Sequence, residues 1–185
     1  RTFSSGNFRA IAGEARQVIK RRQEEITDEF YEDYIRYVFG IVDEGEERSA
    51  RSLIGDGVVK PDSATEEDAR LFAVELMNRL IFIKFLEDKH IVDPDLLLEL
   101  KETHERGIYA GSLYEEMIQP LFYDVMNEKP ADRSPNVTNV DLFAGVPYLN
   151  SGLFRPTIED DDAGFREADF DVRDSVLTDI IDLLE

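Results

Sequence analysis

Two short motifs of this chain combine residue types that could do chemistry, but each lacks part of what that chemistry needs. Pro94-Asp95, followed by Glu99 and Lys101, imitates the acid–acid–lysine metal site of many nucleases. Such a site needs carboxylates from two adjacent strands that converge on one metal ion. Here Asp95 and Glu99 lie on one predicted helical segment, so we expect them to face solvent.

The second motif is Phe143-Ala144-Gly145, which matches the start of a Phe-x-Gly-x-Gly cofactor loop. Pro147 stands where the second glycine should be, and no buried strand precedes the motif. A fragment of a glycine motif without its strand and helix is weak support for a binding loop. We therefore interpret it as structural.

Metal ligation is not indicated elsewhere in the chain. The acidic run 159–162 lacks the alternating ligands and the distal Glu of a calcium loop. His90 and His104 are the only histidines, and there is no cysteine, so no zinc motif is present. We expect no catalytic, cofactor-binding or metal-ligating residue in this chain.

One basic run, Lys20-Arg21-Arg22, could contact a DNA backbone. The alternative is that it pairs with the neighbouring acids Glu24 and Glu25. A wider DNA-binding face would also need Arg16 and Arg79, although acidic residues interrupt that set.

The charge is the most unusual feature of the composition. The chain has 41 acidic against 21 basic residues, for a formal net charge of −20, and arginine outnumbers lysine by 15 to 6. An acidic surface poor in lysine is typical of proteins from a salt-rich cytoplasm, where self-repulsion is screened. We favour a halophilic archaeal origin. The alternative is an acidic protein that binds a basic partner.

Hydrophobic periodicity predicts a mainly α fold without a convincing strand. The expected fold is an irregular multi-helix bundle with long acidic loops and a central helix over residues 71–86. That segment is apolar almost all round, as expected for a helix in the middle of a bundle, and its only polar strip is Glu75 and Arg79. Ser63 to Glu66 is a candidate capping box for it. Further helices are predicted over residues 7–26, 28–42, 93–106, 114–126 and 171–184.

Turn and cap residues set the remaining boundaries. Asp93-Pro94 predicts a helix start and Gly107 its end. Ser112 to Glu115 is a second capping box, and Pro120 should kink or restart the helix that follows. Residues 43–61, with room for one helical turn, and residues 127–139 are predicted loops. We expect residues 1–70 to form an N-terminal arm and residues 71–185 one helical connector domain.

A turn between residues 145 and 156 carries apolar residues that need a packing surface. Asn150 and Gly152 tolerate positive φ, and prolines flank the turn. We interpret the stretch as a structural or domain-junction motif, with a structural turn that closes the bundle favoured over one that positions a domain on DNA. Its residues are Pro147, Tyr148, Leu149, Asn150, Gly152, Leu153 and Phe154.

Three stretches in combination resemble a known family. Residues 78–89 (NRLIFIKFLEDK), 114–127 and 146–154 (VPYLNSGLF) are similar, in order and spacing, to the helical region that precedes the methyltransferase domain in type IIG-like restriction-modification proteins and related phage-defence methylases. The resemblance covers residues 70–185, and Ser151 replaces the family's usual glycine.

The resemblance implies a non-catalytic connector in a parent protein that transfers methyl from S-adenosylmethionine to adenine in DNA, with or without cleavage. The cofactor loop and the catalytic tetrapeptide would lie in a downstream methyltransferase domain, and DNA would be reached through the parent. The alternatives are an acidic protein–protein interaction module of a defence complex and a helical DNA-binding domain. No apolar run is long enough for a membrane span, so we expect a cytoplasmic protein.

Overall fold

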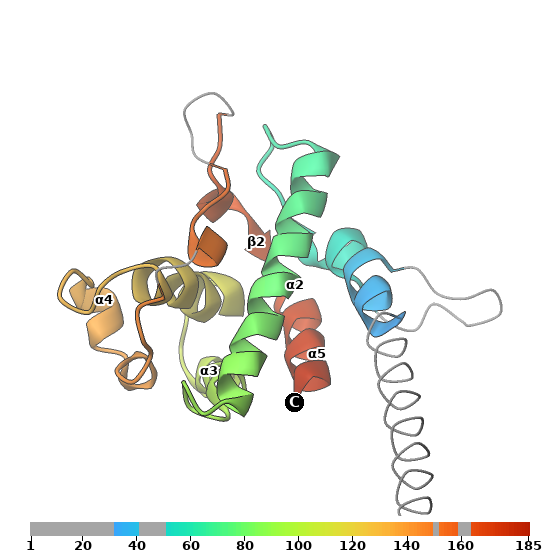
Figure 1. The fold of residues 1–185 in the computed structure, drawn as a ribbon. Helices are drawn as coiled ribbons and strands as arrows, with labels where there is room; N and C mark the ends of the chain where they lie inside the picture. The colour runs from blue at the N-terminus through green and yellow to red at the C-terminus, as the bar shows by residue number, and fades with distance from the viewer. Residues whose placement is uncertain (1–31, 41–50, 150–151, 159–163) are drawn as a thin grey trace, which may run out of the picture.

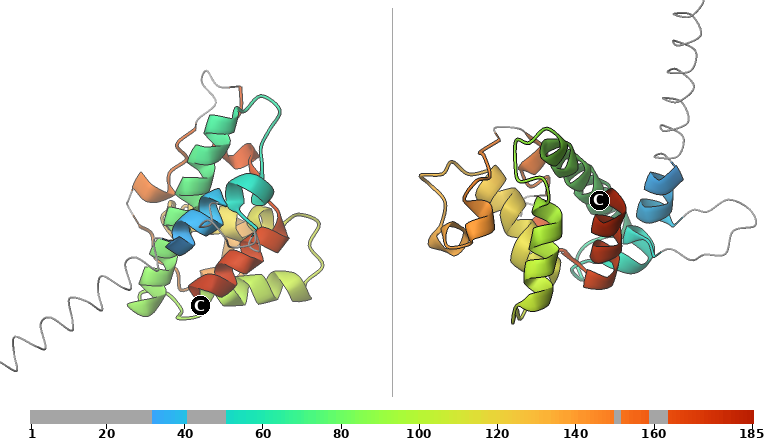
Figure 2. Two further views of the ribbon diagram at one scale, coloured as in Figure 1. Left: turned by 90° about the vertical axis from the view of Figure 1, so that its right-hand side faces the viewer. Right: turned by 90° about the horizontal axis from the view of Figure 1, so that it is seen from below.

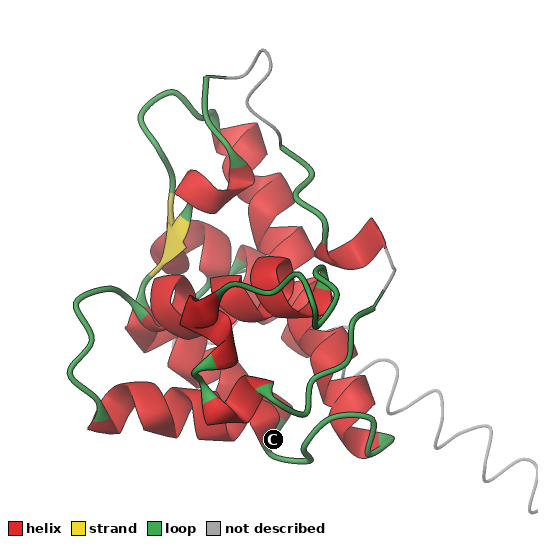
Figure 3. Ribbon diagram, turned by 90° about the vertical axis from the view of Figure 1, so that its left-hand side faces the viewer, coloured by secondary structure: helices red, strands yellow, loops and turns green. Residues whose placement is uncertain are grey.

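The computed structural model describes residues 32–40, 51–149, 152–158 and 164–185, and this part of the chain is mainly helical, as predicted. The other helices are arranged around the long helix α2 (Glu66–Asp88) (Figures 1 and 3). Residues 32–39 are helical, whereas the predicted helix over residues 7–26 lies outside the described residues. Within those residues, no helix has the length and apolar character needed to cross a membrane.

Helix α2 begins two residues later than its predicted cap. Thr65 is the N-cap, and its Oγ1 accepts a hydrogen bond from the Asp68 amide at 3.2 Å, while Asp68 Oδ2 accepts from the Thr65 amide at 2.8 Å. The pair Ser63 and Glu66 and the pair Thr65 and Asp68 both have the three-residue spacing of a capping box. The helix takes the later one, so Glu66 becomes its first residue instead of completing the box.

Most of the circumference of α2 is buried. The residues below 2% exposure lie on more than one side of the helix, which confirms its central position; they are Phe72, Ala73, Leu76, Met77, Arg79, Leu80, Ile83 and Glu87. Among the large apolar residues of α2, Leu71 and Phe85 are the exposed ones, at 45% and 48%. Seen along its axis, α2 has α3 (Leu96–Arg106) and α5 (Asp174–Leu184) beside its C-terminal half (Figure 2).

A Schellman motif ends α2. The His90 amide donates to the Glu87 carbonyl at 2.8 Å, and the Ile91 amide donates to the Leu86 carbonyl at 2.9 Å. This geometry requires a left-handed residue after the C-cap, and His90 takes it with φ 54°. His90 is therefore a helix-end residue.

Helix α3 begins at Leu96 with Asp95 as N-cap, two residues after the predicted start, and ends at Gly107 as predicted. Asp93 accepts instead from the Asp95 amide in the preceding turn, at 3.1 Å. The buried Glu87 of α2 accepts from the Leu97 amide at 2.8 Å. A carboxylate from the neighbouring helix thus binds one of the amides left free in the first turn of α3.

The helical segment over residues 113–126 runs through Pro120 without breaking. It consists of the π-helical turns η2 (Tyr114–Ile118) and η3 (Leu121–Met126), and Pro120 keeps helical angles with φ −61°. Proline lacks an amide hydrogen and clashes with the carbonyl four residues earlier. The wider π turns accommodate it. Pro120 therefore marks a change of helical geometry and not a new helix.

A short antiparallel pair of strands was not predicted. β1 (Val58–Val59) pairs with β2 (Asp171–Val172), with Val58 opposite Val172. The final helix α5 consequently begins at Asp174 and not at residue 171. Strands of two residues are too short to show the alternation of apolar and polar residues from which a strand is predicted. The pairing connects the predicted N-terminal arm, residues 1–70, with the predicted connector domain, residues 71–185. The boundary between these two parts stays a prediction.

The predicted loops contain more structure than expected. The turn η1 (Leu53–Gly57) matches the single helical turn allowed for residues 43–61, and the short helix α4 (Pro135–Thr138) lies within the predicted loop 127–139. Arg133 holds that loop against its neighbours in the chain, because its Nη2 donates to the carbonyls of Val125 and Val146 at 2.8 Å each. Burial lowers the pKa of Arg133.

Candidate functional site

Arg79 lies at the centre of a buried polar cluster on α2. Its side chain is 0% exposed, so its assignment to a DNA-binding face is wrong. Lys20, Arg21, Arg22 and Arg16 lie outside the described residues, and their contact with DNA stays a prediction.

All five N–H groups of the Arg79 guanidinium have acceptors available. Nε donates to the Leu153 carbonyl at 2.7 Å, and Nη2 donates to the Arg155 carbonyl at 3.0 Å and to Glu75 at 3.2 Å. Nη1 donates to the Tyr123 hydroxyl at 3.0 Å and to Glu167 in a buried ion pair. One planar group thus joins α2 to the 152–156 turn, η3 and residue 167.

Glu167 is equally buried and equally well satisfied. Its Oε1 accepts from Arg79 and from the Tyr123 hydroxyl, the latter at 2.8 Å. Its Oε2 accepts from the Thr157 amide at 2.5 Å and from the Thr157 hydroxyl at 3.0 Å. These contacts hold Thr157 and Glu167 against α2 and η3, and a buried carboxylate needs such partners.

The pKa values of the cluster follow from burial and from these contacts. Burial alone would raise the pKa of Glu167, but hydrogen bonds and the charge of Arg79 outweigh it and lower this pKa. Burial would lower the pKa of Arg79, and the contacts with Glu167 raise it instead. Burial raises the pKa of Tyr123 and of Glu75. Both members of the central pair are therefore held in their charged forms.

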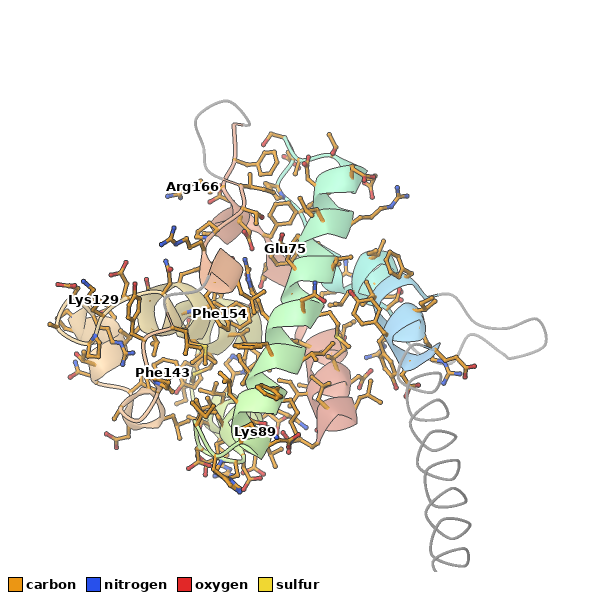
Figure 4. The ribbon with its side chains drawn as sticks, viewed as in Figure 1. Glu75, Lys89, Lys129, Phe143, Phe154 and Arg166 are labelled. Carbon is orange, nitrogen blue, oxygen red and sulfur yellow. The ribbon has the colours of Figure 1, made fainter. Side chains whose placement is uncertain are left out.

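Aromatic rings surround the charged centre. The Arg79 guanidinium carbon lies 5.5 Å from the Phe122 ring centre and 5.4 Å from that of Tyr123, within cation–π range. Phe154 is 0% exposed and its ring lies 5.7 Å from that of Phe122 and 6.1 Å from that of Phe82. Figure 4 shows Phe154 between α2 and the 113–126 segment.

The other described residues of the 145–156 motif are less deeply buried than Phe154, apart from Val146 at 4% exposure. Leu149 and Leu153 are half-buried against the core, and the Leu149 amide donates to the Met126 carbonyl at 2.8 Å. Pro147 and Tyr148 are also half-buried, and Asn150 lies outside the described residues. Gly152, which can tolerate a positive φ, does not adopt one in this turn. It opens the 3-10 turn η5 (Gly152–Phe154).

The residues with candidate chemistry are not brought together. Asp95 occupies the N-cap position of α3 without a side-chain capping hydrogen bond, Glu99 is exposed on that helix, and Lys101 is ion-paired with Asp182 of α5. Phe143 is buried in a 3-10 turn. Among the described residues, no group of three or more His, Asp or Glu side chains is arranged to hold a metal.

Sequence reasoning missed Glu167 and Tyr123 as partners of Arg79. They lie 88 and 44 residues away along the chain, so no local pattern relates them. One signal was present: Arg79 is a cation in a helix that is otherwise apolar on nearly all sides, and such a charge is buried only when it is paired. The sequence paired Arg79 only with Glu75, four residues earlier on the same polar strip, and that contact is present at 3.2 Å.

Comparisons with known proteins match this chain to one family model and to part of a much longer relative. Residues 12–166 match the family model described as a domain of unknown function, DUF7814. A protein of Methanocaldococcus jannaschii, named as an inferred type II restriction enzyme and methyltransferase, is 34% identical over 178 residues. The alignment covers 90% of this chain but only 15% of that relative. No solved structure gives a significant match.

Proposed function

We propose that this chain, which belongs to the DUF7814 family, is a helical connector without catalytic groups of its own in a longer restriction-modification protein. The name of the Methanocaldococcus jannaschii relative supports the class of parent. The small share of that relative covered by this chain supports a segment that serves other domains.

The observation that carries this proposal is the Arg79 centre. Its donors are used on backbone carbonyls and on a buried carboxylate from segments far apart in the sequence. A saturated guanidinium of this kind has no N–H group left for a substrate. It fixes the relative positions of α2, η3, the 152–156 turn and Glu167, which is what a rigid spacer between domains requires.

The parent, by the family resemblance of residues 70–185, transfers methyl from S-adenosylmethionine to adenine in DNA in the cytoplasm. We propose that the methyl donor binds in a separate methyltransferase domain, and that DNA is reached through the parent. We also propose that the charge of −20 reflects a salt-rich cytoplasm.

The test compares the isolated chain with the full-length parent. The isolated chain should bind no S-adenosylmethionine in a calorimetric titration. In the parent, Arg79→Met should leave the affinity for S-adenosylmethionine within about twofold of wild type, while the rate of DNA methylation falls by about tenfold or more because the domains lose their register. Arg70→Met is the matched control, since Arg70 is an exposed arginine on the same helix.

Two results would overturn the proposal. The first is binding of S-adenosylmethionine, or methyl transfer, by the isolated chain. The second is a parent in which Arg79→Met lowers the melting temperature but methylates DNA as fast as the Arg70→Met control. The DNA-binding alternative is tested separately, because affinity for duplex DNA must fall steeply with salt if the chain contacts phosphates.

A further inference from the structure

A groove with an apolar floor lies on the face of the 113–126 segment that α4 covers in part. Its volume is about 390 Å³. The loop after α3 forms one wall and residues 134–143 form the other. Its lining residues are Tyr109, Glu115, Glu116, Met117, Pro120, Asp124, Ser134, Asn136, Val137, Val140 and Phe143.

The floor and one rim of this groove are apolar. Met117, Val137 and Phe143 are nearly fully buried beneath it, so their packing is already satisfied. The rim is different, since Tyr109 is 40% exposed and its neighbour Ile108 is fully exposed. Exposed apolar side chains beside a groove are typical of a surface that binds a partner.

Every charged residue that lines the groove is acidic. Glu115 and Asp124 are exposed, and Glu116 already accepts from the Gly111 amide at 3.1 Å. Asp124 makes no hydrogen bond or ion pair with the described residues. Burial and the nearby charge of Glu128 raise the pKa of Asp124. An unpaired carboxylate next to a like charge is relieved by a cation.

We propose that this groove binds a cationic, apolar-anchored peptide segment of another polypeptide. Lysine or arginine side chains of the segment pair with Asp124 and Glu115, and an apolar side chain lies on the floor between Val140 and Tyr109. This inference goes beyond the connector function, and it gives the acidic interaction-module alternative a defined surface.

Other occupants fit less well. A second copy of this chain carries the same charge of −20 and is repelled. A nucleic acid would place phosphates against three carboxylates. A metal ion requires converging ligands, and the described residues contain no such group of three. Charge complementarity and the exposed apolar rim at Tyr109 together therefore select a basic peptide with an apolar anchor.

The probe is a short fluorescein-labelled peptide of alternating arginine and leucine, titrated with the 185-residue chain at about 0.15 M salt and followed by fluorescence anisotropy. Two matched peptides separate the contributions. One has glutamate in place of every arginine, and the other has serine in place of every leucine. We expect binding of the first peptide, none of the second, and weaker binding of the third by about fivefold or more.

Variants of the chain locate the site. Asp124→Asn with Glu115→Gln should weaken binding by about fivefold or more. Glu99→Gln with Asp179→Asn is the control, because it removes the same charge at exposed positions of α3 and α5. Asn136→Trp should also weaken binding, since a large side chain at this exposed position fills the groove without touching the core. Circular dichroism verifies that each variant is folded.

The proposal is overturned if the glutamate peptide binds as tightly as the arginine–leucine peptide. It is equally overturned if the serine peptide binds as tightly as the arginine–leucine peptide. It is also overturned if the Asp124 and Glu115 variant matches the Glu99 and Asp179 control, since binding would then follow the diffuse negative charge. Unchanged affinity in Asn136→Trp would place the peptide elsewhere. Salt-dependent binding of a labelled DNA duplex by the chain, weakened in Asn136→Trp, would mean that a nucleic acid is the occupant.

Discussion

At the scale of single residues, the Arg79–Glu167 pair favours one packing of the chain over others more than it adds to the net free energy of unfolding. Moving two charges out of water costs several kcal/mol, and their attraction offsets this only when every donor and acceptor is used. Here the guanidinium and the carboxylate have partners at each position, including two backbone carbonyls of the 152–156 turn. A different packing of that turn would leave buried charges unpaired.

Removing Arg79 should therefore be costly. Arg79→Met leaves Glu167 buried without its counter-charge, and we expect the free energy of unfolding to fall by about 3–5 kcal/mol. Chemical denaturation followed by circular dichroism measures the change. Arg70→Met, on the exposed side of α2, should stay within about 0.5 kcal/mol of wild type. A loss of under about 1 kcal/mol in Arg79→Met would show that the pair is not needed for the fold.

The same pair should give the stability a defined dependence on pH. The pKa of Glu167 is lowered from 4.5, because its contacts with Arg79 outweigh the effect of burial. A carboxyl with a lowered folded-state pKa contributes stability above its unfolded-state pKa, and this stability is lost as pH falls through the folded-state value. Glu75 and Glu87 have raised pKa values, mainly through burial, and act in the opposite direction.

A variant isolates the contribution of Glu167. The difference in unfolding free energy between wild type and Glu167→Gln should be constant between about pH 6 and pH 8 and should shrink as pH falls below about 4.5. Denaturation curves at several pH values provide the measurement. The effect of Glu87 largely cancels in this difference, whereas the variant also removes the charge of Glu167, which contributes to the raised pKa of Glu75. A difference that persists unchanged to about pH 3 would contradict the assigned direction.

At the scale of elements, the sequence identified the helices better than their junctions. The burial of helix α2 could be predicted from its apolar segment 71–86, and the end of α3 could be predicted from Gly107. Both signals are local in the sequence. The strand pair of residues 58–59 with 171–172 depends on residues more than a hundred positions apart. The same holds for the site: burial of Phe154 follows from its apolar neighbours, whereas the pairing of Arg79 with Glu167 requires the tertiary fold.

The 152–156 turn depends on a single aromatic anchor. Phe154→Ala removes a ring that is 0% exposed and packs against Phe122 and Phe82, so we expect a loss of about 3–5 kcal/mol in unfolding free energy. Gly152→Ala is the control in the same turn. A Cβ there meets no atom within 4 Å, and the residue has no positive φ, so the change should be within about 0.5 kcal/mol. A loss below about 1 kcal/mol for Phe154→Ala would identify it as a loosely packed junction residue.

At the scale of the whole molecule, the core and the surface impose opposite demands. The core is continuous from Val38 and Leu53 through α2 to α5, and it favours a compact chain. The formal charge of −20 opposes compaction, because exposed acids repel one another over distances of a Debye length. Many of the basic residues are already used in internal contacts, as with Arg79, Arg133 and Lys101. The surface therefore has few cations with which to neutralise itself.

We predict that salt stabilises this chain strongly. Raising potassium chloride from about 0.1 M to about 2 M should increase the unfolding free energy by about 2 kcal/mol or more, because the Debye length falls from about 10 Å to under 3 Å. Urea denaturation at each salt concentration measures the increase. A variant with several exposed acids replaced by glutamine, among them Glu99 and Asp179, should be more stable at low salt and less responsive to added salt. A stability that is flat or falls with salt in both proteins would exclude adaptation to a salt-rich cytoplasm and leave recognition of a basic partner as the reason for the acidic surface.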